Sequence, residues 1–277
     1  MRLVSGIYEG QPRAGRLISD DEIEILDAPD AVAAWRAGPQ IRVLGRCAPQ
    51  GFTLLAPSPC PSKILGLGLN YQDHIREGGR ESPKSQVWFN KQTSALNRPH
   101  GDVIKPRNTK ALDYEGELVV IIGRRCRHVP ASKALSAVAG YAAGCDYSVR
   151  DWQKRAPTMH LGKSFDSHAV FGPHMVSAEA VKDPQDLRVR AWVNDELRQD
   201  GHTGDMIATV AEQIAYLSQA MTLMPGDVLY TGTPAGVGQW FDPPKYLVVG
   251  DRVRVEIDGI GRLENRIVAD TSAFVLE

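Results

Sequence analysis

Two glutamates stand where a polar segment runs into a strongly apolar one. Glu115 and Glu117 belong to an Asp-Tyr-Glu-Gly-Glu segment, which is followed by the β-branched run 118–122 and by Gly123. A short apolar run closed by glycine predicts a buried strand. Side chains alternate along a strand, so both glutamates point to the same side. Two like charges entering a buried region are unfavourable unless a positive partner meets them, and a divalent cation is one such partner.

A third carboxylate extends this acidic group. Asp146 follows a second apolar stretch at residues 137–145. Three carboxylates are hard oxygen ligands, which favour Mg²⁺, Mn²⁺ or Ca²⁺ over Zn²⁺. In the alternative interpretation, Glu115 and Glu117 are solvated residues at a strand end, paired with nearby arginine or lysine. The residues by themselves leave both interpretations open.

A histidine and a glutamate are spaced to act together. A strand predicted over 63–69 leads to a short helix that begins after Asn70, a good N-cap, and ends at a Gly-Gly pair. His74 and Glu77 then lie on one face of the helix. A carboxylate that holds one imidazole nitrogen makes the other nitrogen more basic, which is how a general base is built. The alternative is a surface pair that contributes about 0.3 kcal/mol to stability.

Polar groups that can contact a ligand follow downstream. Ser148 and Asp151 resemble a capping box, which predicts a helix that carries Arg150 and Gln153 beside the acidic group. An ordinary salt bridge is the alternative for Arg150. Lys163 lies among small and apolar residues, a setting that suits either a functional cation or a solvated lysine.

Segment 231–238, Thr-Gly-Thr-Pro-Ala-Gly-Val-Gly, is dense in glycine. Glycine lets backbone N–H groups approach an anion closely. No Gly-Lys-Ser/Thr follows, so the segment is not a P-loop, and a carboxylate or another small anion is the expected ligand. A structural turn is the alternative.

The bulk composition excludes several classes of protein. The chain has 277 residues, 43% apolar and 23% charged, with a formal net charge of −1. This is typical of a soluble globular protein, and it lacks the basic surface that nucleic acid or an anionic membrane attracts. The four cysteines have no C-x-x-C spacing, and we see neither a signal peptide nor a membrane-spanning run. We therefore expect a cytoplasmic protein with reduced thiols.

Three prolines between residues 56 and 61 indicate a linker. We place a small N-terminal domain at residues 1–60 and a catalytic domain at 61–277. Helices are predicted over 19–26 and 31–37 in the first part. The second part is predicted to contain a helix and two hairpins, at 206–221, 187–201 and 250–265.

Taken in order, these segments strongly resemble the fumarylacetoacetate hydrolase family, and within it the acylpyruvate and fumarylpyruvate hydrolases. The resemblance extends from residue 63 to the C-terminus. The motifs that carry it are Gly68-Leu69-Asn70-Tyr71-x-x-His74-x-x-Glu77, Phe89-Asn90-Lys91-Gln92-Thr93, Asp113-Tyr114-Glu115-Gly116-Glu117, Asp146-Tyr147-Ser148-Val149-Arg150-Asp151-Trp152-Gln153, Gly162-Lys163-Ser164-Phe165-Asp166 and Thr231-Gly232-Thr233-Pro234-x-Gly236-Val237-Gly238.

The resemblance implies a metal centre and a dyad. Glu115, Glu117 and Asp146 match the family's ligands for Mg²⁺ or Mn²⁺, with Ca²⁺ as a further candidate. His74 and Glu77 match its catalytic dyad, on a segment that orders over the bound substrate. The implied fold is α+β and β-rich, a mixed β-sheet roll with a small N-terminal α/β domain, normally assembled as a homodimer or larger.

The remaining matches concern the substrate. Lys163, Arg150 and Gln153 match the family's contacts to the substrate and its developing oxyanion, and Thr233 matches a carboxylate-binding position. Two departures bear on substrate choice and leave the metal set untouched. Ala208 stands where an aromatic residue is frequent, and Asp166-Ser167-His168 stands where Asp-Thr is frequent after Ser-Phe.

The expected activity is metal-dependent hydrolysis of a carbon–carbon bond in a β-diketo acid, of the acylpyruvate or fumarylpyruvate type, to pyruvate and a carboxylic acid. In this scheme His74, oriented by Glu77, activates a water, and Lys163 stabilises the oxyanion. The expected setting is aromatic catabolism. A 2-oxo acid decarboxylase of the oxaloacetate type, an enol–keto isomerase or a hydratase of the same family is the alternative. A binding protein without turnover is a further one, against which the intact dyad argues.

Overall fold

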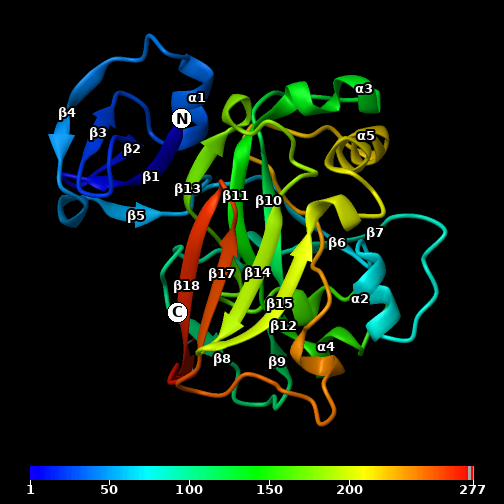
Figure 1. Ribbon diagram of the computed structural model, residues 1–277. Helices are drawn as coiled ribbons and strands as arrows, with labels where there is room; N and C mark the ends of the chain where they lie inside the picture. The colour runs from blue at the N-terminus through cyan, green and yellow to red at the C-terminus, as the bar shows by residue number, and fades with distance from the viewer. Residues whose placement is uncertain (274–275, 277) are drawn as a thin grey trace.

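The computed structural model describes residues 1–273 and 276 and is rich in β-structure (Figure 1). Its strands are β1 (Arg2–Tyr8), β2 (Gln11–Leu17), β3 (Ile23–Leu26), β4 (Val43–Cys47), β5 (Thr53–Leu55), β6 (Ile64–Gly68), β7 (Val87–Lys91), β8 (Val103–Lys105), β9 (Leu112–Asp113), β10 (Gly116–Ile122), β11 (Val138–Asp146), β12 (Ser148–Val149), β13 (Ala169–Ser177), β14 (Arg188–Val193), β15 (Glu196–His202), β16 (Val228–Tyr230), β17 (Arg252–Ile257) and β18 (Gly261–Ala269).

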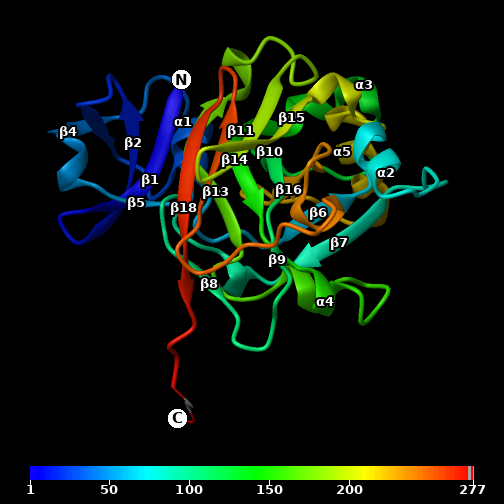
Figure 2. The same cartoon turned by 60° about the horizontal axis from the view of Figure 1, so that its bottom comes forward.

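The helices are short and lie around the sheets (Figures 1 and 2). They are α1 (Ala31–Ala37), α2 (Gln72–Glu77), α3 (Ala131–Ala134), α4 (Arg150–Gln153) and α5 (Val210–Ala220). Within the part of the chain that the structure describes, no helix has the length and apolarity needed to cross a bilayer.

Two large sheets organise the molecule. The first has eleven strands in the order β4-β3-β2-β1-β13-β11-β10-β16-β6-β7, with β5 paired to β1. The second has five strands in the order β15-β14-β17-β18-β8. Most pairs are antiparallel, but β16–β6 and β18–β8 are parallel. The expected β-rich, mixed-sheet α+β fold is confirmed.

Strand β10 lies in the middle of the large sheet, between β11 and β16, and every residue in it is buried. Its even-numbered apolar residues pack in the core shared with the second sheet, while Val119 and Ile121 pack in a second core that includes residues of α1. Burial on both faces explains why the sequence has a continuous apolar run here instead of an alternating one.

The first sixty residues extend the large sheet. Strand β1 pairs with β13 through Arg2–Val176 and Leu3–Met175. In the proline-rich segment, the Ser58 hydroxyl donates to the carbonyl of Gly226 at 2.7 Å. The division of the chain at residue 60 stays a prediction.

Most of the predicted elements are confirmed, among them the helix at 31–37 and both hairpins. The helix predicted over 19–26 is wrong, because residues 23–26 form strand β3, which pairs with β2 and β4. All four β3 residues are buried, and Ile23 and Ile25 pack with Val4 and Phe52. Pairing on both edges outweighs the local capping signal. All four cysteines are free thiols, as expected.

Two predicted caps are also wrong. The N-cap of α2 is Tyr71, and the amide of Asn70 instead donates to the carbonyls of Ala208 and Thr231 at 3.1 and 2.8 Å. Helix α4 begins after Val149 without a side-chain cap. The hydroxyl of Ser148 instead donates to the Asp146 carbonyl at 3.1 Å.

Replacement of Ile121 by alanine tests the importance of the doubly buried strand. Ile121 is fully buried, so we expect the I121A variant to lose about 2–5 kcal/mol of unfolding free energy in urea denaturation. Ile18 is 44% exposed, and I18A is the matched control with an expected loss below about 0.5 kcal/mol. Equal losses in the two variants would contradict this account of β10.

Candidate metal centre

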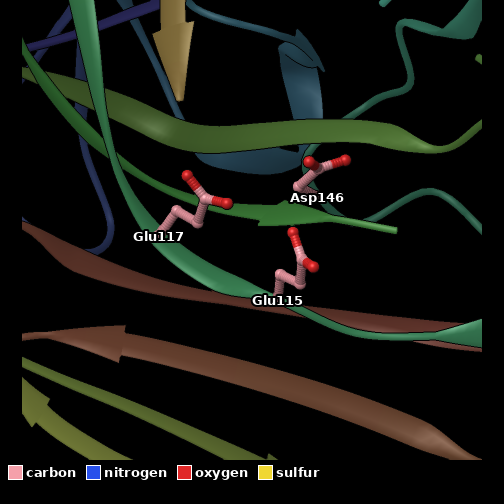
Figure 3. A group of neighbouring side chains, drawn as sticks. All are labelled: Glu115, Glu117 and Asp146. Carbon is pink, nitrogen blue, oxygen red and sulfur yellow. The ribbon is translucent and has the colours of Figure 1, made fainter. Parts of the chain in front are cut away.

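The three predicted carboxylates meet at one end of the large sheet (Figure 3). Strands β10 and β11 are antiparallel with Glu117 opposite Gly144, so the start of β10 lies beside the end of β11. The N–H of Asp146 donates to the carbonyl of Glu115 at 2.9 Å and closes this corner. Glu115, Glu117 and Asp146 each offer an oxygen, and these oxygens lie within 4.8 Å of one another.

The carboxylates are buried, and lysines neutralise two of them. Glu115 and Asp146 are 5% and 0% exposed. The ammonium of Lys163 lies 2.6 Å from Glu115 Oε2 and 2.8 Å from Asp146 Oδ2, and a second buried lysine, Lys91, pairs with the other oxygen of Asp146. Burial alone would raise the pKa of Glu115, but Lys163 and Arg150 hold that pKa well below its usual range.

Glu117 differs from its neighbours. Its carboxylate accepts the N–H of Gly232 at 2.6 Å, but no basic side chain in the described part of the chain lies within 4.0 Å of it. Burial, together with the charges of Asp146 and Glu115, raises the pKa of Glu117 well above its usual value. This carboxylate therefore lacks the positive partner that its neighbours have.

The composition of the site fits a hard divalent cation. Four buried carboxylates, Asp113 and the three above, face three buried cations, Lys91, Arg150 and Lys163. Carboxylate oxygens without a nitrogen or sulfur ligand suit Mg²⁺ or Mn²⁺. A cation between Glu115, Glu117 and Asp146 would supply the charge that Glu117 lacks. The arrangement is thus an acidic site suited to a metal ion.

Arg150 is held beside the trio by a residue that the sequence prediction missed. Its Nε donates to Asp113 Oδ2 at 2.8 Å, and its Nη1 donates to Glu115 Oε1 at 2.6 Å and to Gln153 Oε1 at 3.0 Å. Its Nη2 is buried and has no hydrogen-bond partner in the described structure. Asp113 thus fixes one edge of the guanidinium, and Nη2 keeps an unused hydrogen-bond donor at the site.

Asp113 and Lys91 both belong to motifs that carried the family resemblance, yet neither was predicted as a site residue. Asp113 opens the Asp-Tyr-Glu-Gly-Glu segment, and Lys91 closes strand β7. Lys91 contacts Asp146 from a position 55 residues away in sequence. The local sequence around a lysine does not show whether it pairs with a distant buried carboxylate or is solvated. The only signal for Lys91 and Asp113 was therefore their position in the family motifs.

The predicted dyad is formed. His74 Nδ1 lies 2.7 Å from Glu77 Oε1, which leaves Nε2 as the free ring nitrogen. Glu77 Oε2 in turn accepts the N–H of Gly236 at 2.8 Å. Asp73, on the same helix, accepts the N–H of Ala235 at 3.1 Å. The glycine-rich segment therefore orients the dyad by binding helix α2.

The glycine-rich segment 231–238 forms hydrogen bonds with several carboxylates. In addition to its contacts with Glu77 and Asp73, it donates the N–H of Gly232 to Glu117. The N–H groups of Gly238 and of the adjoining Gln239 donate to Asp113 at 2.8 and 3.1 Å. The expected anion is thus supplied by the protein's own side chains. Glycine is required at position 236, because φ is +101° and a Cβ would lie 1.8 Å from the Arg198 carbonyl oxygen.

One cavity of about 320 Å³ collects five of the nine predicted site residues, which are His74, Glu115, Arg150, Gln153 and Lys163. The other four, Glu77, Glu117, Asp146 and Thr233, are not part of its wall. The hydroxyl of Thr233 is already engaged, because it donates to the Gly116 carbonyl at 2.9 Å and accepts from Gln199 at 2.7 Å. Its role in substrate binding stays a prediction.

The comparisons with known proteins identify the family. Residues 63–268 match the family model for the Fumarylacetoacetate (FAA) hydrolase C-terminal domain. The chain belongs to the fumarylacetoacetate hydrolase family. The resemblance to this family that was inferred from the motifs is therefore confirmed.

Two curated relatives in this family are named as tautomerases. "Oxaloacetate tautomerase FAHD2A, mitochondrial" of Homo sapiens is 38% identical over 248 residues, which cover 89% of this chain and 78% of that protein. "Oxaloacetate tautomerase YisK" of Bacillus subtilis is 43% identical over 219 residues, which cover 77% of this chain and 72% of that protein.

Solved structures with the same fold have several activities. A fumarylacetoacetate hydrolase from Exiguobacterium antarcticum has a TM-score of 0.84 at 35% identity, covering 97% of this chain and 99% of the other. A maleylpyruvate hydrolase from Sphingobium sp. SYK-6, in complex with manganese (II) ion and pyruvate, has a TM-score of 0.78 at 32% identity with the same coverage. A 5-carboxymethyl-2-hydroxymuconate delta-isomerase from Mycobacterium smegmatis has a TM-score of 0.83 at 29% identity, covering 98% and 100%.

Replacement of Glu117 by glutamine tests the acidic site. In wild type, Mn²⁺ at about 100 times its dissociation constant is expected to add about 2.7 kcal/mol of stability, because it binds only the folded chain. We expect the E117Q variant to lose most of this gain in thermal unfolding and to bind Mn²⁺ at least about tenfold more weakly in calorimetry, since one ligand charge is gone. The same variant without metal is expected to be as stable as wild type, because the raised pKa of Glu117 favours its neutral form and a glutamine oxygen can still accept the N–H of Gly232.

The matched control is Glu9→Gln, which changes an exposed glutamate far from the site in sequence. Mn²⁺ is expected to stabilise this variant as much as wild type. Full Mn²⁺ stabilisation of E117Q would contradict the assignment of Glu117 as a ligand.

Proposed function

We propose that this protein is a metal-dependent enzyme that interconverts the enol and keto forms of oxaloacetate or a closely related 2-oxo diacid. The observation that carries this proposal is one cavity bordered by His74, by Lys163 and by Glu115, the member of the carboxylate trio that reaches its wall. A proton donor–acceptor and a fixed cation thus lie beside a site for a divalent metal. These are the groups that proton transfer next to a 2-oxo group requires.

The metal site would be formed by Glu115, Glu117 and Asp146, with Mg²⁺ or Mn²⁺ as the ion. When bound, the ion would supply a Lewis acid that favours the enolate form of a 2-oxo acid. Support comes from the carboxylate-only donor set and from the manganese and pyruvate in the related maleylpyruvate hydrolase.

The side chains of this protein would carry out the proton transfer. His74 Nδ1 is held by Glu77, so Nε2 would remove a proton from C3 of the keto form and return it in the reverse direction. The Lys163 ammonium would stabilise the negative charge that develops on the C2 oxygen. The protonated His74 would then deliver the proton taken from C3 to the C2 oxygen, so that the imidazole returns to its starting form and the reaction is balanced without a further reactant.

The curated relatives favour this reaction over the hydrolysis expected from sequence. Proteins named oxaloacetate tautomerase match this chain at 38% and 43% identity. Tautomerisation needs only proton transfer beside the oxo group. Hydrolysis of a carbon–carbon bond needs in addition a positioned water and a distal carbonyl.

Hydrolysis of an acylpyruvate or fumarylpyruvate is the second candidate. The His74–Glu77 pair that would move a proton is equally suited to activate a water. The maleylpyruvate hydrolase of the same fold supports this candidate. A homodimeric assembly and a cytoplasmic location, both expected from the sequence, are also proposals.

The deciding experiment mixes the purified protein with the enol form of oxaloacetate and follows the loss of its ultraviolet absorbance. We expect catalysis to require Mg²⁺ or Mn²⁺ and to fall at least about 100-fold in the His74→Gln variant, which loses the general acid–base. Mn²⁺ binding by this variant is expected to match wild type, because His74 is not in the carboxylate trio.

A Glu115→Ala/Glu117→Ala variant controls for contaminating activity. Product analysis by NMR separates the alternatives. Release of CO₂ would identify a decarboxylase, whereas pyruvate and an acid from fumarylpyruvate, without faster tautomerisation of oxaloacetate, would identify the hydrolase. Full activity in the His74→Gln variant would contradict the proposed role of the dyad.

A further inference from the structure

Two cations border the cavity without an acidic partner. Arg80 follows α2 by three residues, and Lys154 is the residue at the C-cap of α4. Both side chains are exposed. Among residues 1–273 and 276, no carboxylate lies within 4.0 Å of either charged group. Their charges are therefore free to meet a ligand in the cavity.

The other two cations of the cavity are already engaged. Lys163 binds Glu115 and Asp146, and Arg150 binds Asp113 and Glu115. Lys163 and Arg150 are each 1% exposed, so they lie at the buried end, and Arg80 and Lys154 lie at the open end. The cavity thus has an inner end that contains Glu115 and a basic outer rim.

The backbone fixes the positions from which the rim residues extend. The N–H of Arg80 donates to the Ile75 carbonyl at 3.1 Å, and the N–H of Lys154 donates to the Arg150 carbonyl at 3.2 Å. The Arg80 guanidinium carbon lies 5.8 Å from the centre of the Trp240 ring. Helix α2, which ends three residues before Arg80, and helix α4, which ends just before Lys154, lie on the same side of the molecule (Figures 1 and 2).

Apolar side chains occupy the wall of this cavity between its charged groups. Val87, Phe89 and Met159 all border the space. An apolar wall favours the hydrocarbon part of a ligand, and a basic rim favours an anionic end. A ligand that fits has a metal-binding 2-oxo carboxylate at one end, a short carbon chain, and a negative charge at the other end.

We propose that Arg80 and Lys154 form a binding subsite for the distal carboxylate of the substrate, and so select 2-oxo diacids over 2-oxo acids with a neutral tail. This inference rests on the proposed function only for the placement of the 2-oxo end at the carboxylate trio. In this proposal Arg80 and Lys154 select the substrate and take no part in proton transfer.

The test compares two stable ligands of equal chain length. 2-Oxoglutarate ends in a carboxylate and 2-oxovalerate ends in a methyl group. Titration calorimetry on the Mn²⁺-loaded protein is expected to show at least about tenfold tighter binding of 2-oxoglutarate, because only this ligand forms charge-assisted hydrogen bonds at the rim. In the Arg80→Gln/Lys154→Gln variant the two ligands are expected to bind equally, with 2-oxovalerate unchanged.

The Arg76→Gln/Arg155→Gln variant is the matched control. It removes the same charge from exposed positions on the same two segments, at residues that do not border the cavity. We expect it to keep the preference for 2-oxoglutarate. Equal loss of this preference in both variants would show a general charge effect and overturn the proposal. The proposal would also be overturned if the wild type showed no preference, or if the preference survived in R80Q/K154Q.

Kinetics separate this proposal from the proposed reaction. With oxaloacetate, the R80Q/K154Q variant is expected to show a KM at least about tenfold higher with kcat within about twofold of wild type, because the reacting end is untouched. If the protein lacks tautomerase activity but retains the calorimetric preference, the proposed reaction fails and the subsite stands. If it has the activity without the preference, the subsite fails alone.

Discussion

The central constraint on this structure is the burial of four carboxylates at one end of a sheet. Asp113, Glu115, Glu117 and Asp146 are all at most 5% exposed. Isolated buried charges would be strongly unfavourable, so each must be met by a cation or by hydrogen-bond donors. Two lysines and Arg150 neutralise part of the charge, and Glu117 has only a backbone N–H. A divalent cation would satisfy this imbalance.

The glycine-rich segment 231–238 also compensates buried carboxylates, through its backbone N–H groups. Its backbone N–H groups donate to carboxylates from two different parts of the chain, namely the segment that contains Asp113 and Glu117, and helix α2. One loop therefore links the carboxylate trio, the aspartate that holds Arg150, and the dyad. Through its contact with Glu77, the loop also supports the ring orientation of His74 at the cavity. The site is consequently built as one hydrogen-bonded unit.

Local sequence predicted secondary structure correctly where the apolar pattern of a segment matches its burial in the fold. The apolar run after Glu117 predicted strand β10, and the alternating residues of 187–193 predicted β14. It failed where distant partners compete. The segment around Ile23 looks like a capped helix but pairs with two strands, and Asn70 looks like a cap but binds Ala208 and the segment after β16. In each case tertiary hydrogen bonds replace the local ones.

The order of the motifs in the sequence predicted the family, and the resemblance in turn implied the carboxylate trio and the role of the His74–Glu77 pair. Local spacing by itself predicted only that Glu115 and Glu117 share one side of a strand and that His74 and Glu77 share one face of a helix. Only the tertiary structure decided which charges are compensated. Lys91 and Asp113 join the site through contacts 55 and 37 residues apart, and Arg80 and Lys154 remain unpaired in the described structure. Compensation depends on distances and burial in three dimensions, since charges interact strongly only when they are close and shielded from water. Spacing along the chain carries no such information.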